Sequence, residues 1–138
     1  MKEFRTFTES INLPSGNTDI INVGQLLFII EQSRIFHWQT PSYAEHKALG
    51  KFYEGLEELI DSFAESAMGQ VGVPRGGNWS LDLRNYGEYP LDQFMDDVMT
   101  EFKGMKREVS EDMSDLQNIL DEMIAVTTRT RYLLHLQG

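Results

Sequence analysis

The sequence predicts an all-α domain built as a four-helix bundle, with a long connection between its second and third helices. Four stretches carry apolar residues three and four positions apart, which is the spacing of amphipathic helices. The breaks after the first and third stretches are short, and short breaks favour antiparallel neighbours. Residues 69–90, between the second and third stretches, are instead rich in glycine and contain proline.

Helix start signals justify the first two elements. Asn17 and Thr18 are N-cap residues for a first helix that we expect to run to about Trp38. Thr40, Pro41 and Ser42 then turn the chain into a second helix over residues 43–68. Ser42 with the glutamate three residues later forms the pattern of a capping box. These two helices should therefore form an antiparallel hairpin.

The last two helices are predicted in the same way. Pro90 suits the first turn of a third helix, which should continue to about Val109. A break near Ser110 should start a fourth helix that ends near Leu136. Residues 1–16 should be an N-terminal tail or loop, so that the bundle domain covers residues 17–138.

Composition limits the possible functions. The 138 residues suffice for one domain, and the chain is 41% hydrophobic and 25% charged, as globular proteins are. It has no cysteine, which excludes disulfides, thiolate zinc sites and iron–sulfur clusters. A net charge of −10 disfavours DNA binding and suits a surface that attracts cations. We see no signal peptide and no membrane span, so we expect a cytoplasmic protein with no membrane contact.

The candidate metal ligands are His37, His46, Asp61 and Glu65. This ligand mix suits iron, with zinc or manganese as alternatives. Asp61 and Glu65 lie one turn apart on the predicted second helix and can share an ion. His46 precedes Asp61 by fifteen residues, or about 22 Å along a helix, so one chain cannot bring it to the same ion.

The distance closes if two copies of the second helix pack antiparallel about a two-fold axis. His46 of one copy then lies beside Asp61 and Glu65 of the other, as in an isologous dimer. Gly55 falls near the midpoint, where we expect it to allow close approach of the two backbones. A homodimer through the second helices is the predicted assembly.

The order His37-Trp38, His46, Asp61 and Glu65 resembles the ferroxidase signature of the Dps proteins, the twelve-subunit miniferritins. The resemblance implies a ferritin-like bundle, a dodecameric shell, and oxidation of Fe(II) with hydrogen peroxide or oxygen at the intersubunit site, followed by iron storage. It also implies a redox role for Trp38. The alternative interpretation is that Trp38 is an aromatic residue of the core. A short helix in the long connection, at Trp79 and 81–83, is implied as well.

The sequence departs from that family at two points. His37 and His46 are nine residues apart, where the family has about a dozen, and Gly50 replaces an acidic residue that often follows the second histidine by four. A ferritin-like assembly or interaction protein without productive iron oxidation is therefore the alternative. DNA condensation comes third, because the N-terminal tail offers only Lys2 and Arg5 as basic residues.

Other polar residues are explained more simply, without a role in the metal site. Glu54, Glu57 and Glu58 are expected to form a solvated acidic face, and His135 is not expected to bind metal because no carboxylate lies three or four residues away. Acids near the start of the fourth helix either line an entry pore, as the resemblance implies, or form a surface. They are Glu111, Asp112, Asp115, Asp121 and Glu122.

Overall fold

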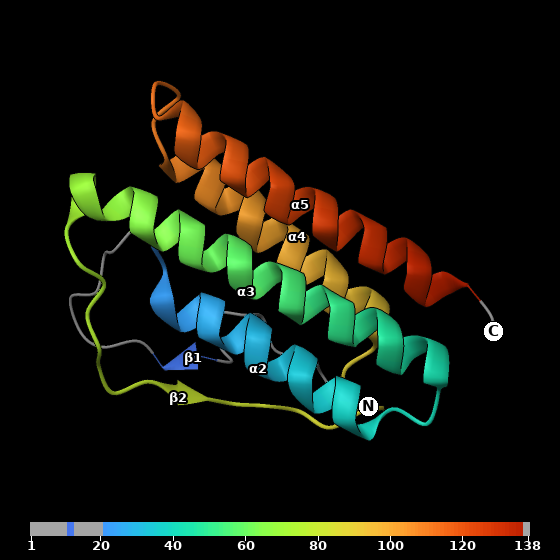
Figure 1. Cartoon of the computed structure of the whole chain (residues 1–138). Coiled ribbons are helices and arrows are strands. Elements are labelled where there is room, and N and C mark those ends of the chain that lie inside the picture. Colours follow the sequence, from blue (N-terminus) through green and yellow to red (C-terminus); the bar gives the residue numbers. More distant parts are fainter. Residues whose placement is uncertain (1–10, 13–20, 137–138) are drawn as a thin grey trace.

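The computed structural model describes residues 11–12 and 21–136 and is mostly helical, as predicted (Figure 1). Its elements are β1 (Ile11–Asn12), α2 (Val23–Gln39), α3 (Tyr43–Val71), β2 (Ser80–Leu81), α4 (Leu91–Glu108) and α5 (Ser114–His135). α3 packs against both α2 and α5, and α4 packs against α5. The all-α class and the long connection between the second and third helices are confirmed.

The α2–α3 hairpin confirms most of the predicted boundaries. α2 begins at Val23, later than expected, and the predicted caps Asn17 and Thr18 lie outside the described residues. Ser42 caps α3 as predicted, because its hydroxyl oxygen accepts from the backbone N–H of Glu45 at 3.2 Å. The second half of the capping box is absent. The hydroxyl of Thr40, and not the Glu45 carboxylate, accepts from the N–H of Ser42.

The long connection contains no helix among residues 72–90, so the short helix expected at Trp79 and 81–83 is wrong. Ser80 and Leu81 instead form β2, which pairs antiparallel with β1 inside the segment predicted to be a tail. Two glutamines of α2 hold the connection further on. Gln39 accepts from the backbone N–H of Tyr86 at 2.7 Å. Gln32 donates to the backbone carbonyl of Arg84 and accepts from its N–H, both at 2.8 Å. Around residues 84–86, side chains of α2 therefore take up backbone hydrogen bonds of the connection.

α4 begins where Pro90 predicted, but α5 begins four residues later than expected, at Ser114. Gln117 explains the delay. Its side-chain amide donates to the carbonyls of Lys106 (3.1 Å) and Val109 (2.8 Å), and so satisfies free carbonyls at the end of α4. The α4–α5 turn is thus fixed by a residue of the next helix.

The core lies between the four helices and contains most of the large aromatic side chains. Phe36 packs edge-to-face on Phe94 and on Tyr89, with ring centroids 5.4 Å and 6.1 Å apart. Trp38, for which a core position was one reading, is 65% exposed. None of the described helices is both long enough and apolar enough to span a membrane.

Candidate metal centre

His37 and His46 lie against each other at the closed end of the α2–α3 hairpin. Their rings are stacked, with centroids 3.9 Å apart and planes inclined by 14°. The Nδ1 atom of His37 lies 2.6 Å from the backbone carbonyl oxygen of His46, and the Nδ1 atom of His46 lies 2.8 Å from that of His37. The two histidines predicted as ligands are therefore brought together within one chain.

These reciprocal hydrogen bonds fix where the protons are. A carbonyl oxygen can only accept, so each Nδ1 carries hydrogen and each neutral ring leaves its Nε2 lone pair available. Metal-binding histidines in proteins are usually held in this way, through a hydrogen bond from the other ring nitrogen. Both rings are thus in the tautomer that can bind a metal through Nε2.

The stacking limits what the pair can do together. An imidazole binds a metal in its own ring plane, at about 2 Å from nitrogen. An ion in the plane of one stacked ring lies well outside the plane of the other. In this arrangement each ring can bind its own ion, and one ring must turn before both can bind the same ion.

Gly50 leaves space for the His37 ring. A Cβ atom at this position would lie 2.9 Å from Cε1 of His37, which is closer than real side-chain contacts, and 3.2 Å from Nδ1. The His37 ring therefore occupies the space that a side chain at position 50 would need, where the Dps pattern often has an acidic residue. The signal in the sequence was a glycine one turn after His46 in a helix interior.

Arg34 and Tyr53 continue the face beyond the histidines. Tyr53 meets His37 edge-on at 5.4 Å between ring centroids, and the Arg34 guanidinium lies 4.6 Å above the Tyr53 ring. Arg34 also pairs with Glu57 at 2.8 Å and with Glu31 at 3.6 Å. Glu57, expected on a solvated acidic face, is therefore part of an ion-pair cluster, and Arg34 and Tyr53 are site residues that the sequence did not single out.

Asp61 and Glu65 are exposed on α3, far from the histidines of the same chain. The fifteen residues of helix between His46 and Asp61 separate them by about 22 Å. Within residues 11–12 and 21–136 of one chain, no group of three or more His, Asp or Glu side chains can hold a metal ion. The intersubunit site stays a prediction. In it, the two histidines of one chain would meet Asp61 and Glu65 of the other.

The two halves nevertheless share one face of α3. His46, Gly50, Tyr53, Glu57 and Asp61 are three or four residues apart, so they form one stripe along the helix. Gly55 does not belong to it. At about 100° per residue, Gly55 lies on the opposite side of α3 from Glu57, and a Cβ there would meet nothing within 4 Å. A dimer through this stripe would therefore not place Gly55 at the closest approach of two copies, and the expected role of Gly55 stays a prediction.

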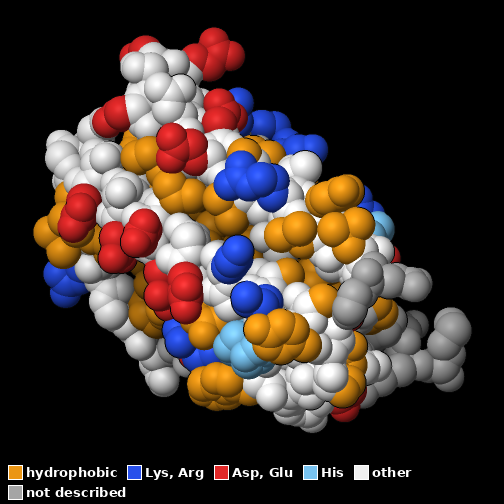
Figure 2. All heavy atoms as spheres, turned by 45° about the vertical axis from the view of Figure 1, so that its right-hand side comes forward, with side chains coloured by type: hydrophobic (Ala, Val, Ile, Leu, Met, Phe, Trp, Pro, Cys, Tyr) orange, Lys and Arg blue, Asp and Glu red, His pale blue; other side chains and the backbone are white. Residues whose placement is uncertain are grey.

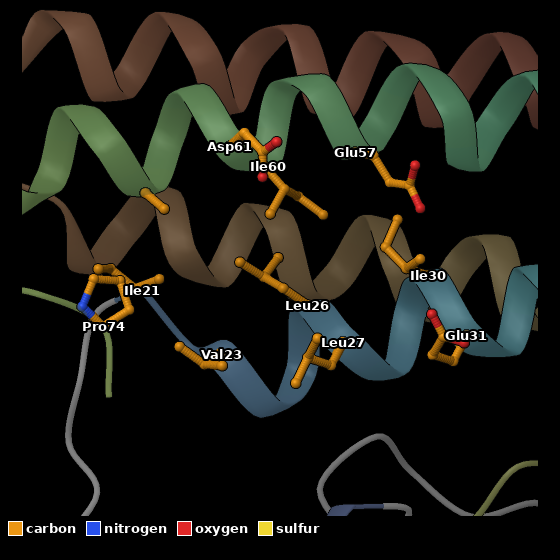
Figure 3. Close-up of a pocket in the computed structure, with 11 residues that line it drawn as sticks. Ile21, Val23, Leu26, Leu27, Ile30, Glu31, Glu57, Ile60, Asp61 and Pro74 are labelled. Carbon is orange, nitrogen blue, oxygen red and sulfur yellow. The ribbon is translucent and has the colours of Figure 1, made fainter. Parts of the chain in front are cut away.

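An apolar groove of about 410 Å³ lies between α2 and α3 at the Asp61 end of the stripe (Figure 3). Its floor and walls are aliphatic, and the carboxylates of Glu31, Glu57 and Asp61 line it as well. The apolar lining residues are Ile21, Val23, Leu26, Leu27, Ile30, Ile60, Ala64 and Pro74.

His135 was not expected to bind metal, because no carboxylate lies near it on its own helix. In the structure its Nε2 atom lies 2.7 Å from the carboxylate of Asp92, which comes from α4. The pair is exposed, and among residues 11–12 and 21–136 no third ligand joins it to form a metal-binding group. Of the acids near the start of α5, Asp121 forms an ion pair with Lys106 at 2.6 Å, while the other four expected there are exposed.

Two comparisons place the chain among known sequences. The profile of a protein family described as a family of unknown function (DUF5856) matches residues 37–134, a range that includes all four predicted ligands. An uncharacterized 14.6 kDa protein encoded in the mobD-ri intergenic region of Enterobacteria phage T4 is 25% identical over 103 residues. The match covers 73% of this chain and 75% of the phage protein. No solved structure matches the chain significantly.

Proposed function

The chain belongs to the DUF5856 family of unknown function, and we propose that it is a Dps-like ferroxidase and iron-storage protein with a ferritin-like bundle. One observation supports this most directly. His37 and His46 are both held through Nδ1, so that Nε2 of each is free to bind metal. Asp61 and Glu65 supply oxygen ligands from a second copy, at the other end of the same helix.

Iron is the substrate of the proposed reaction. Two Fe(II) ions each give one electron to hydrogen peroxide, which takes up two protons and leaves as two water molecules. Carboxylates bind Fe(III) better than Fe(II), so Asp61 and Glu65 favour the oxidised product. The imidazoles hold the ferrous ions beside them. In the proposed assembly of twelve chains, the product is stored inside the shell.

The test is anaerobic titration with Fe(II), followed by addition of hydrogen peroxide, with ferric absorbance and particle mass recorded on the same sample. We expect saturable Fe(II) binding, rapid oxidation, and a particle of many chains that stays soluble as it loads. Oxidation no faster than in buffer would refute the ferroxidase and leave a ferritin-like assembly protein as the function. The stacked rings favour that second candidate, because they do not present both lone pairs to one ion.

Gly50→Ala should separate metal binding from stability. Alanine in a helix interior favours the fold by about 1 kcal/mol relative to glycine. The new methyl group, however, must displace the His37 ring from its hydrogen bond to His46. Loss of such a supporting bond lowers metal affinity roughly 10–100-fold. We expect urea unfolding at an equal or higher midpoint, and Fe(II) binding weakened by that factor in anaerobic calorimetry.

Gly55→Ala is the matched control for this prediction. It makes the same substitution in the same helix, at a position where the new methyl group meets nothing within 4 Å. It should raise stability and leave Fe(II) affinity unchanged. Equal affinity of the Gly50→Ala and Gly55→Ala proteins would show that the position of the His37 ring does not matter for binding.

A further inference from the structure

Two large aromatic side chains are exposed at the histidine end of the α2–α3 face. Trp38 is 65% exposed and Tyr43 is 72% exposed. Lys47 lies close by, with its Nζ atom 5.6 Å from the centre of the Tyr43 ring, and it has no ion-pair partner in the described part of the chain. Figure 2 shows histidine, hydrophobic and basic side chains gathered on one part of the surface. We call Trp38, Tyr43 and Lys47 the aromatic end.

The opposite end of the same face is an apolar groove that carries acidic side chains. The groove between α2 and α3 is apolar, and Leu27 at its edge is 44% exposed. Asp61 is one of its carboxylates and forms no ion pair within residues 11–12 and 21–136. Figure 3 shows Leu27 and Asp61 on opposite sides of the groove, from α2 and α3. The groove thus offers an aliphatic surface with the carboxylate of Asp61 beside it.

Helix periodicity places both ends on the same side of the molecule. Tyr43 and Ala64 lie on the α3 stripe that contains His46 and Asp61. On α2, Trp38 follows Leu27 by eleven residues, which is close to three helical turns, so both face one way. A two-fold axis midway between the aromatic end and the groove places the aromatic end of each copy against the groove of the other.

We propose that the groove receives the aromatic end of a second copy of this chain. The register that puts His46 opposite Asp61 also puts Tyr43 opposite Ala64, so that a large ring meets a small residue of the groove. Lys47 then lies near Asp61, and two charges that form no ion pair in the described part of the chain neutralise each other across the interface. The interface rests on the two-fold pairing within the proposed function, but it requires no iron.

Sedimentation velocity over a concentration series, without metal, tests the interface. Trp38→Ala removes an interface aromatic and should weaken association roughly 30-fold. Tyr132→Ala is its control, because Tyr132 on α5 is equally exposed at 64%. Leu27→Glu places a charge in the groove and should abolish association. Leu133→Glu, at a side chain 41% exposed, should not. All four positions are on the surface, so each variant should remain folded.

Charge reversal tests the register. Lys47→Glu alone should weaken association because it places like charges near Asp61. Adding Asp61→Lys in the same protein should restore association. If Lys47→Glu and Asp61→Lys each weaken association and the double variant does not restore it, this register is contradicted.

Tryptophan fluorescence gives a second measurement that does not depend on hydrodynamics. The chain has two tryptophans, so a Trp79→Phe background leaves Trp38 as the only one. Its emission should shift to longer wavelength on dilution, as the ring leaves the groove. A spectrum that does not change with concentration, in a protein still monomeric at about 100 µM, would overturn the interface, since specific dimers form well below this concentration.

These outcomes are distinct from those that test iron oxidation. A dimer that forms without metal, depends on Trp38 and Leu27, and oxidises no iron supports the interface and refutes the ferroxidase. Rapid iron oxidation by a protein whose assembly is insensitive to Trp38→Ala and Leu27→Glu refutes the interface alone.

Discussion

An Asp61→Ala, Glu65→Ala double variant should assemble at high protein concentration and oxidise Fe(II) no faster than buffer. Both side chains are exposed and form no ion pair in the described part of the chain, so their loss should leave the fold intact. In the proposed site they are the only oxygen ligands. The loss should exceed the roughly 100-fold that removal of a supporting residue already costs a metal site. Stopped-flow absorbance of the ferric product, with particle mass on the same sample, measures both effects.

Glu54→Ala, Glu58→Ala is the matched control. These two glutamates are also exposed, also lie four residues apart on α3, and change the net charge by the same amount. The control should keep its oxidation rate, which separates a specific site from general attraction of cations to an acidic surface. Equal kinetics in the two double variants would remove Asp61 and Glu65 from the site.

α3, α4 and α5 could be predicted because each buries an apolar stripe, and the period of that stripe is visible in the sequence. α2 has apolar residues around most of its circumference, so its prediction depended on its apolar content and on the break that follows it. Local signals predicted the starts of α3 and α4. Ser42 is the N-cap of α3, and Pro90 directly precedes the first residue of α4. The start of α5 was missed because Gln117 reaches back to the carbonyls that end α4. No local pattern distinguishes that glutamine from one that faces solvent.

The candidate site was predictable only in part. The pairing of His37 with His46 follows from the short turn between two helices, and the structure brings the two together. Their stacking and their bonds to each other's carbonyl oxygens depend on backbone positions that the sequence does not give. Trp38 is exposed although its residue type favoured the core. The contribution of a second chain stays a prediction.

The long connection was the least predictable segment, because its conformation is imposed by side chains of α2. Gln32 and Gln39, two helical turns apart, bind the backbone of residues 84 and 86. Glycine and proline in the connection indicated that a break occurs there, but they carry no information on what the segment packs against.

Gln32→Met should be among the most destabilising single substitutions in the chain. Gln32 is fully buried, and its amide satisfies both the N–H and the carbonyl of Arg84. Methionine has a similar length but can neither donate to the carbonyl nor properly accept from the N–H. Loss of the side chain that satisfies a buried backbone group costs about 1–3 kcal/mol. We therefore expect the free energy of unfolding in urea to fall by about 2–4 kcal/mol, a large share of the roughly 5–15 kcal/mol typical of a domain.

Gln39→Met isolates burial as the cause. Gln39 donates to the side chain of Asn85 at 2.8 Å and accepts from the backbone N–H of Tyr86 at 2.7 Å, so it makes an equivalent pair of bonds to the same segment. It is exposed, however, and water can replace it at both groups. The expected loss is within about 0.5 kcal/mol, as for other surface substitutions. Equal losses at the two positions would mean that the number of hydrogen bonds, and not their burial, decides how firmly the connection is held to α2.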